Sequence, residues 1–392
     1  MAMLGDEIVI TGLGAVTPLG GDVTTTWGRL IKGESAIEKD PLDGCLKARI
    51  SGPGFTREQQ EKDSHKKHLE ILRRAVSEAI AASGVPRDSA GLFLLCQSKP
   101  LVGIFENFSE NLPGGYGACV ASDFNFKNKI VKNIVAACSG GIQAVYSAVI
   151  SLMSGVADFA VIGVAETSIY PLYTSAFKRM GVLARRKMMP FDCRREGFAI
   201  GEGAAAVVIE KKTSVSPLRR GKILARIEGI YSGASSKDIL DIGEDPDAIV
   251  RAIWSLTSEG ASKEKAVLPD VDYIHAHGTA TRSNDAAEAL AITRVFENSA
   301  NGDFLRRKVS VSSTKAATGH LLGASGILGL IFAVCAIKDK KIPPTLNLEE
   351  PVTQDIDFTP VRYKVKNVKR AMALAYGFGS QVGAVLVGEL RL

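Results

Sequence analysis

The chain lacks paired metal-binding cysteines and a long uninterrupted apolar run. Its six cysteines show neither a Cys-x-x-Cys pair nor the Cys/His spacing of a zinc site. The most apolar stretch, Leu321–Ile337, is interrupted by Gly323, Gly326 and Gly329 and is shorter than the about 20 apolar residues that cross a bilayer. We therefore expect no structural metal and no membrane span, and we interpret this stretch as a buried core helix.

Other classes of protein are disfavoured by what the sequence has little of. The N-terminal residues contain neither a basic region nor a long apolar region, so we expect no secretory signal and a cytoplasmic location. The turn Gly12-Leu13-Gly14 lacks the third glycine of a dinucleotide-binding fingerprint, since Thr17 stands at that position. The net charge of +6 is scattered, without a basic stripe of interleaved aromatics, which disfavours nucleic-acid binding. The basic clusters are either solvated faces or a docking surface for an acidic partner: Lys66-Lys67, Arg73-Arg74, Arg185-Arg186-Lys187, Arg219-Arg220 and Arg306-Arg307-Lys308.

What the sequence does contain is an alternation of strands and helices. Over 392 residues, an apolar content of 46% and a charged content of 23% are ordinary for a folded protein. The alternation predicts an α/β protein with a buried sheet. The predicted strands are Glu7–Gly12, Gly91–Cys96, Ile134–Ala137, Phe159–Val164, Ala204–Ile209, Ile223–Ile230, Tyr273–Ala276, Val309–Ser312, Arg370–Ala375 and Ala384–Leu386. The predicted helices are His68–Ser83, Pro246–Thr257, Asp285–Phe296 and Gly326–Ile337.

The polar stretch Lys211–Lys222 is the best candidate for a domain boundary, since it combines serine, proline and glycine between two apolar strands. We predict one half at residues 1–215 and a second at residues 216–392. The two halves share a similar order of elements, which suggests an internal structural duplication.

One cysteine lies where its chemistry would be useful. The apolar run Ile134–Ala137 ends at Cys138, and the small residues Ser139, Gly140 and Gly141 lead into a helical pattern. A thiol at such a turn meets the positive end of the helix dipole, which favours the thiolate. A lone cysteine is more often a buried structural thiol. The small residues favour a nucleophile here, because they let the backbone approach the sulfur and leave amides free.

Two histidines far along the chain could assist this thiol. His275 and His277 are two residues apart, so an extended chain points them to opposite faces. His277, which opens a Gly-Thr turn, is the better candidate for a site, and His275 is interpreted as structural. Lys315 and His320 lie among small residues in the segment 313–320. A cysteine with two remote histidines outlines thioester chemistry.

Two further histidines, His65 and His68, lie in a polar, lysine-rich segment. We expect both to be surface residues.

Together these motifs resemble the β-ketoacyl-acyl carrier protein synthases, the condensing enzymes of the thiolase fold, and among them the elongating synthases. The resemblance runs from about residue 7 to residue 388. It implies two duplicated α/β halves stacked in αβαβα layers. The matching motifs are Ala137-Cys138-Ser139, Pro190-Phe191-Asp192, Glu196-Gly197-Phe198, Gly201-Glu202-Gly203-Ala204, His277-Gly278-Thr279 with Asn284-Asp285, Thr314-Lys315 with Thr318-Gly319-His320, and Gly377-Phe378-Gly379.

The resemblance also implies a role for each matched residue. Cys138 would carry the acyl chain as a thioester, and His277 and His320 would bind the malonyl thioester carbonyl and stabilise the enolate. Lys315 would hold His320 and the local field. The remaining roles are implied as follows: Asp285 and Glu288 support this network, Thr279 and Thr281 bind the pantetheine arm, the backbone N–H groups of Cys138 and Phe378 form the oxyanion hole, and Phe378 gates the acyl tunnel.

The resemblance implies an acyl carrier protein as partner, with a homodimer as the expected assembly and a heterodimer with a related subunit as the alternative. It implies neither a metal nor a redox cofactor. A non-catalytic chain-length-factor-like subunit is disfavoured, because such subunits typically lose the nucleophilic cysteine. A thiolase is disfavoured, because no cysteine follows Cys335 to act near the C-terminal loop.

The chain departs from the family pattern around the site. The segment Pro113–Lys132 is shorter than its counterpart, which leaves the acyl chain length and the dimer partner open. Leu374-Ala375 and Tyr376 replace the family's Asn-Ser and the first Phe of Phe-Gly-Phe-Gly, and Ser380-Gln381-Val382 replaces Gly-Thr-Asn. After Asp238, Leu240-Asp241 replaces the family's His-Met. These changes suggest a specialised pathway rather than housekeeping fatty-acid elongation.

Overall fold

The computed structural model describes residues 2–51, 64–99, 115–126, 128–235, 246–257, 271–297 and 309–390. The interior of segment 113–132 is therefore described only in part, and the loop around Asp238 lies outside the described residues.

Eleven strands within these ranges form one twisted sheet, in the order β13-β11-β10-β15-β16-β9-β1-β8-β6-β4-β5. Their bounds are β1 (Ala2–Val16), β4 (Ala90–Gln97), β5 (Asn128–Val135), β6 (Phe159–Glu166), β8 (Gly203–Lys211), β9 (Ala225–Ala234), β10 (Tyr273–His275), β11 (Ser310–Ser312), β13 (Asp357–Phe358), β15 (Arg370–Gly377) and β16 (Gln381–Gly388). Small strands pair at the periphery: β2 (Ile37–Lys39), β3 (Leu46–Ala48), β7 (Ile200–Gly201), β12 (Lys341–Ile342) and β14 (Lys364–Val365).

The two halves of the sheet repeat one pattern of strand directions. In the first half β5, β4 and β6 are parallel, and β8 and β1 follow antiparallel. In the second half β11, β10 and β15 are parallel, and β16 and β9 follow antiparallel. The halves join where β1 pairs with β9. This repetition shows the structural duplication, although the division at residues 215 and 216 stays a prediction because both halves share one sheet.

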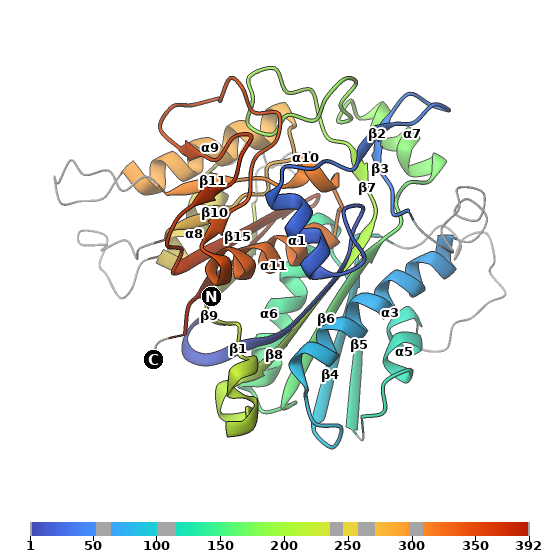
Figure 1. Cartoon of the computed structure of the whole chain (residues 1–392), viewed down its shortest axis with the longest axis vertical. Helices are drawn as coiled ribbons and strands as arrows, with labels where there is room; N and C mark the ends of the chain where they lie inside the picture. The colour runs from blue at the N-terminus through green and yellow to red at the C-terminus, as the bar shows by residue number, and fades with distance from the viewer. Residues whose placement is uncertain are drawn as a thin grey trace.

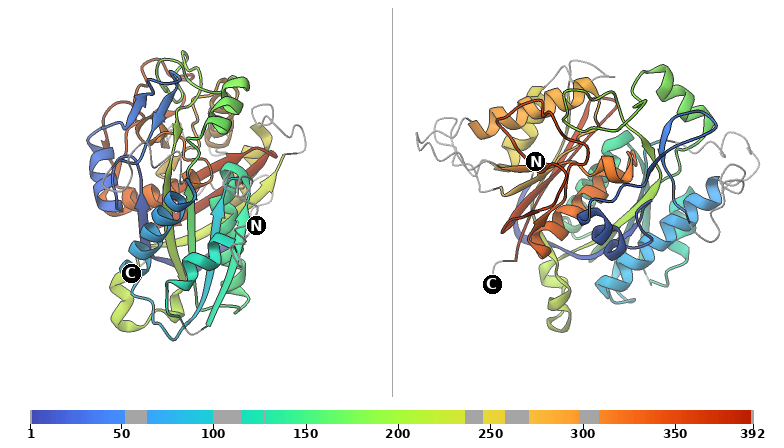
Figure 2. Two further views of the ribbon diagram at one scale, coloured as in Figure 1. Left: turned by 90° about the vertical axis from the view of Figure 1, so that its right-hand side faces the viewer. Right: turned by 45° about the horizontal axis from the view of Figure 1, so that its top comes forward.

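Helices cover and separate the two halves in the order αβαβα. Helix α3 (Ser64–Ser83) packs on β1, β8 and β6, whereas α8 (Pro246–Thr257) packs on β9 and β16 and against α9 (Arg282–Glu297). Between the halves lie α6 (Gly140–Met153) and α11 (Ala324–Asp339), each of which contacts strands of both. Figure 1 shows this central pair with α3 on one side and α8 and α9 on the other, and the right-hand view of Figure 2 shows the same order.

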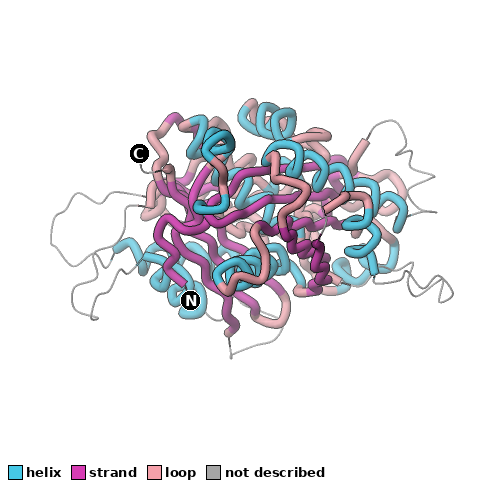
Figure 3. The backbone as a smooth tube through the Cα atoms, turned by 90° about the horizontal axis from the view of Figure 1, so that it is seen from below, coloured by secondary structure: helices cyan, strands magenta, loops and turns pink. Residues whose placement is uncertain are grey.

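The remaining helical segments connect the layers at their ends, and Figure 3 shows helices on both sides of the strands. They are α1 (Val23–Ile31), α5 (Gly115–Ser122), η1 (Ala137–Ser139), α7 (Pro171–Arg179), η2 (Lys212–Ser214), η3 (Pro217–Lys222) and α10 (Lys315–Thr318).

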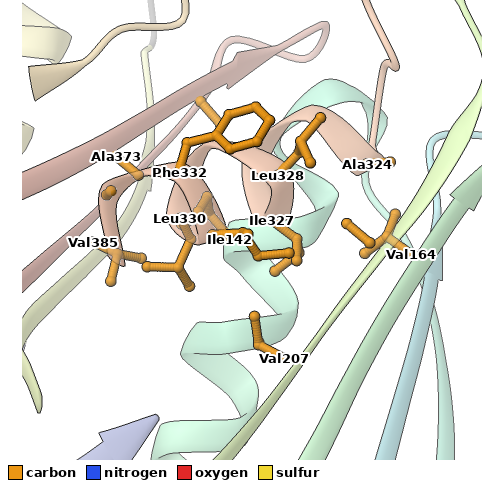
Figure 4. Close-up of a cluster of buried hydrophobic side chains, with 14 of the residues drawn as sticks. Ile142, Val164, Val207, Ala324, Ile327, Leu328, Leu330, Phe332, Ala373 and Val385 are labelled. Atoms are coloured by element: carbon orange, nitrogen blue, oxygen red, sulfur yellow. The ribbon is translucent and has the colours of Figure 1, made fainter. Parts of the chain in front are cut away.

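The core lies around α11, whose residues from Ala324 to Ile337 are all buried. Figure 4 shows Ile327 and Leu330 of this helix beside Ile142 of α6. Burial on every side explains why this helix is apolar all round and carries no polar face. Its interpretation as a buried core helix is confirmed, and none of the helices in the described ranges is long and apolar enough to span a membrane.

One expectation about the surface is wrong. His68 and Lys67 are both buried, although a surface position was expected for this lysine-rich segment. Helix α3 turns them inward, where Lys67 forms an ion pair with the buried Glu202. Burial lowers the pKa of His68 to about 4, so it is neutral near pH 7. The partner carboxylate comes from a distant segment, which is why the local sequence pattern could not predict this burial.

Candidate active site

Cys138 lies in a tight turn between β5 and α6. The turn is η1, and Ala137 there has a φ of 44°, in the left-handed region that non-glycine residues rarely adopt. Helix α6 begins at the next glycine, where a Cβ on Gly140 would lie 2.7 Å from the sulfur of Cys96. The turn therefore requires small residues, and it places the Cys138 side chain, which is 7% exposed, at the start of the helix.

The thiol of Cys138 is less acidic than its position at the helix start suggests. Burial raises its pKa to about 12, and the Glu166 carboxylate acts in the same direction, whereas Lys99 and Lys315 lower it. The lysine Lys99 is itself held by Glu166, at 3.2 Å between Nζ and Oε2. Desolvation thus outweighs the nearby positive charges, and the thiol is protonated at neutral pH. Burial therefore opposes the thiolate, which the position at the helix start was expected to favour.

A cavity of about 250 Å³ is lined by several of the residues that the resemblance implied for the site. Its lining includes Cys138 from the first half and residues of the second half that approach from separate loops. These are His277, Thr279, Thr281, His320 and Phe378. The rings of His277 and His320 lie 5.5 Å apart between centroids, at an angle of 80°. Thus one thiol and two imidazoles, far apart in the sequence, face one space.

His277 is held through its main chain. Its N–H donates to Glu288 Oε1 at 2.7 Å, and the N–H of Gly278 donates to Glu288 Oε2 at 2.8 Å. Gly278 has a φ of 40°, and a Cβ there would lie 2.5 Å from Cβ of Ser313, so the turn needs glycine. His275 points the other way and pairs with Thr314 Oγ1 at 3.0 Å. The prediction that these two histidines face opposite sides is confirmed.

His320 follows the short helix α10 and is held through its ring. Its Nδ1 pairs with Ser325 Oγ at 3.0 Å, while its main-chain N–H donates to the Ala199 carbonyl at 2.8 Å. Burial and the charge of Lys315 lower the pKa of His320 well below its usual range, and the same causes act on His277. Both imidazoles are therefore neutral at pH 7, and each can donate from one ring nitrogen.

Lys315 lies behind the two histidines, buried at 3% exposure. Its Nζ donates to the main-chain carbonyl of His277. The resemblance implied that Lys315 holds His320, but its hydrogen bond is to the other histidine, and its charge acts on both rings. Burial lowers the pKa of Lys315 to about 8, while Glu288 and Cys138 oppose this change. Burial also raises the pKa of Glu288 to about 7.

Asp285 supports the loop that carries the two threonines. Its carboxylate accepts hydrogen bonds from the N–H of Phe191 at 2.7 Å and of Ala280 at 3.1 Å. Ala280 adopts a φ of 64°, so the carboxylate stabilises a strained residue between Thr279 and Thr281. The hydroxyls of these threonines lie 3.0 Å apart at the cavity. Asp285 and Glu288 thus hold loops in place rather than face the cavity themselves.

Phe378 lies at the turn between β15 and β16 and is 37% exposed, the most open of the predicted site residues. A Cβ on the preceding Gly377 would lie 3.0 Å from both the Cys138 and the Ser139 main-chain nitrogens. The absence of a side chain at position 377 therefore lets this turn approach the start of α6 closely.

Sequence reasoning missed several residues of the site. Tyr376, Phe198 and Leu322 also line the cavity, and Ser325 orients His320. Glu166 and Lys99 act on Cys138 from behind. Tyr376 had a usable signal, since it replaces a phenylalanine of the resembling family next to Gly377-Phe378. Glu166 and Lys99 had none, because the fold alone brings the ends of β4 and β6 beside the thiol.

Comparisons with known proteins agree on one family. The family described as "Beta-ketoacyl synthase, N-terminal domain" matches residues 5–90 and 95–214, and "Beta-ketoacyl synthase, C-terminal domain" matches residues 224–349. A mitochondrial 3-oxoacyl-[acyl-carrier-protein] synthase of Arabidopsis thaliana is 31% identical, with 98% of this chain and 93% of the relative covered. The 3-oxoacyl-[acyl-carrier-protein] synthase 2 of Coxiella burnetii is 28% identical, with 98% of this chain and 99% of the relative covered.

A solved structure shows the same fold. It is a ketosynthase in complex with its acyl carrier protein from a type II polyketide system, with a TM-score of 0.81 at 24% identity, covering 98% of this chain and 100% of that one. The fold, the matched family descriptions and the relatives therefore lead to one conclusion: this chain belongs to the β-ketoacyl synthase family.

Proposed function

We propose that the protein catalyses a decarboxylating Claisen condensation, in which an acyl group on Cys138 joins malonyl-acyl carrier protein to give a 3-oxoacyl-acyl carrier protein. The observation that carries this proposal is the cavity that Cys138, His277 and His320 line together. A thiol is a good temporary carrier of an acyl group, and two neutral donors suit a developing enolate oxygen. Because both partners share one cavity, formation of the carbon–carbon bond becomes effectively unimolecular.

In the first step Cys138 accepts the acyl group. Its sulfur attacks the incoming thioester carbonyl, the bond from that carbon to the carrier sulfur breaks, and the thiol proton ends on the departing carrier thiol. The main-chain N–H groups of Cys138 and Phe378 would bind the carbonyl oxygen as it becomes negative. The close approach of Gly377 to the Cys138 nitrogen supports this pairing.

In the second step the malonyl thioester loses carbon dioxide. The electron pair of the broken carbon–carbon bond remains on the thioester, which becomes an enolate. The enolate oxygen would accept hydrogen bonds from His277 and His320. With Ser325 as donor to Nδ1 of His320, the ring proton of His320 lies on Nε2 and is free to donate. The enolate carbon then attacks the thioester on Cys138, and the released sulfur takes up a proton.

The partner that delivers both thioesters would be an acyl carrier protein. A larger hollow of about 890 Å³ adjoins the catalytic cavity and shares Met180, Val182 and Thr281 with it. Its lining contains more basic than acidic side chains: Lys39, Lys178, Arg185 and Arg282 against Asp43 and Glu196. A pantetheine arm could reach Cys138 from there past Thr281, while the basic residues attract an acidic carrier. Arg185 of the cluster at 185–187 lines this hollow, which supports a role in docking rather than a merely solvated face.

The assembly would be a homodimer, with a heterodimer as the alternative. Strand β5 lies at the edge of the sheet, and its Ile130 and Val135 are 41% and 53% exposed. No further strand pairs with this edge among the described residues, and an edge strand with exposed apolar side chains favours pairing with another chain. The nucleophile at Cys138 favours a catalytic chain over a chain-length-factor-like subunit. A cytoplasmic location stays a prediction from the sequence, and cell fractionation would test it.

The proposal is tested by supplying the purified protein with acyl- and malonyl-loaded carrier proteins and measuring the mass of the products. We expect a 3-oxoacyl-carrier protein, with one carbon dioxide released for each product. The matched control omits the acyl donor. A panel of acyl chain lengths that gives neither product nor acylated Cys138 would overturn the proposal, and the best donor would reveal the preferred chain length.

A further inference from the structure

Tyr376 is a buried residue of the site, and the reaction steps proposed above assign it no role. It lies near the end of β15 with 1% exposure and lines the cavity beside Cys138. Its ring centroid is 5.1 Å from that of His277, at an angle of 64°. The phenolic hydroxyl distinguishes Tyr376 from the phenylalanine that the resemblance implies at this position.

The Glu288 carboxylate acts on the hydroxyl of Tyr376. Burial and this carboxylate raise the pKa of Tyr376 well above its usual range, so the phenol is neutral and able to donate. Yet no described residue completes a hydrogen bond with it. An unpaired buried hydroxyl is destabilising, so a use for it is expected.

Glu288 can accept this donor. Its two oxygens already accept the N–H groups of His277 and Gly278, and a carboxylate has lone pairs for about four hydrogen bonds. The other charged groups that act on Glu288 are Asp285 on the same helix and Lys315 on α10. A hydrogen bond from the neutral Tyr376 hydroxyl would stabilise the ionised form of Glu288. The ionised carboxylate accepts both N–H groups of the turn at His277 and so holds that turn in place.

We propose that Tyr376 is a positioning residue for His277: its ring packs against the imidazole, and its hydroxyl donates to Glu288 during the decarboxylation step. This inference rests on the proposed condensing function. It concerns the enolate half of the reaction alone, since Tyr376 contributes nothing to the acyl transfer onto Cys138.

The test compares Tyr376→Phe with the unaltered protein in the two half-reactions. We expect acylation of Cys138 to change less than about twofold. Without the Tyr376 hydroxyl, Glu288 loses a hydrogen-bond donor and is easier to protonate. The acid limb of the pH profile for decarboxylation of malonyl-carrier protein should therefore move up by roughly one pH unit, and the rate on the acid side should fall about tenfold. In a Glu288→Gln background the same change should have no further effect on this profile.

Tyr273→Phe is the matched control. Tyr273 is also fully buried, but its hydroxyl pairs with Ser312 Oγ at 2.8 Å, away from the cavity. Its loss should lower the melting temperature without moving the pH profile. A Tyr376→Phe profile that superimposes on that of the unaltered, active protein would overturn this inference alone. Absence of decarboxylation and condensation in the unaltered protein would overturn the proposed function, and this inference with it.

Discussion

The two walls of the catalytic cavity differ in how they are built. The first half contributes Cys138 on a turn of small residues, backed by the apolar start of α6. The second half contributes His277 and His320 in front of a buried polar cluster of Lys315, Glu288 and Asp285. The halves share one pattern of strands, so the duplication set the architecture and local loops set the chemistry.

This difference matches the two demands of the proposed reaction. An acyl group needs a nucleophile and room, and an apolar surrounding is enough to hold it. An enolate needs fixed donors whose positions do not relax, and a network of hydrogen bonds supplies them. Changes in the thiol wall should therefore act on acyl transfer, and changes in the histidine wall on decarboxylation.

The largest effect is expected for Cys138→Ala. No acyl-enzyme should form and condensation should be abolished, because the carrier of the acyl group is gone. Intact-mass spectrometry after incubation with an acyl-carrier protein measures this. Cys193→Ala is the control, since Cys193 is the exposed free cysteine of the described residues and its loss should leave the adduct in place. An acyl adduct on the Cys138→Ala protein would contradict the assignment.

Substitution of either histidine should have the next largest effect. We expect His277→Ala and His320→Ala each to slow decarboxylation by about 10²–10³, the usual result of removing one donor to a developing oxyanion. Release of carbon dioxide from malonyl-carrier protein measures it. His275→Asn is the control, because His275 bonds Thr314 outside the cavity. Equal losses in all three variants would point to misfolding rather than to lost donors.

Deprotonation of Lys315 should set the alkaline limit of the decarboxylation rate. Burial lowers its pKa to about 8, so it is charged below that pH and loses its charge above it. Decarboxylation should therefore fall as the pH rises past about 8, and Lys315→Met should be slow at every pH and lack this limb. Rates between pH 6 and 10 provide the measurement. An alkaline limb that survives in the variant would mean that another group causes it.

The smallest effect is expected at the threonines. Thr279→Val and Thr281→Val should each raise KM for malonyl-carrier protein several-fold with little change in kcat, as expected when one hydrogen bond of about 1 kcal/mol is lost equally from bound substrate and transition state. Steady-state kinetics separate the two constants. A fall in kcat with KM unchanged would place these hydroxyls in the chemistry instead.

Much of the fold could be predicted from the sequence because its signals are local. The helix at Pro246–Thr257 has the predicted bounds, and α11 is buried as its apolar pattern indicated. The motifs around Cys138, His277 and His320 were visible for the same reason, since each turn needs its own small residues.

What could not be predicted depends on contacts between distant segments. Lys67 lies in the interior, where it forms an ion pair with Glu202. Burial and the nearby Glu166 carboxylate raise the pKa of the Cys138 thiol. Tyr376 of β15 and Glu288 of α9 both contact His277 only because the fold brings these distant segments together.

The formation and consumption of the acyl adduct on Cys138 in the His320→Ala variant test most directly whether the two walls act in separate steps. The variant is given an acyl-carrier protein, freed of excess donor, and then given malonyl-carrier protein while its intact mass is followed. We expect the acyl adduct to form on Cys138 at nearly the normal rate and then to be consumed about 10²–10³ times more slowly than in the unaltered protein, because decarboxylation is slowed. Failure to acylate, or consumption of the adduct as fast as in the unaltered protein, would contradict this expectation.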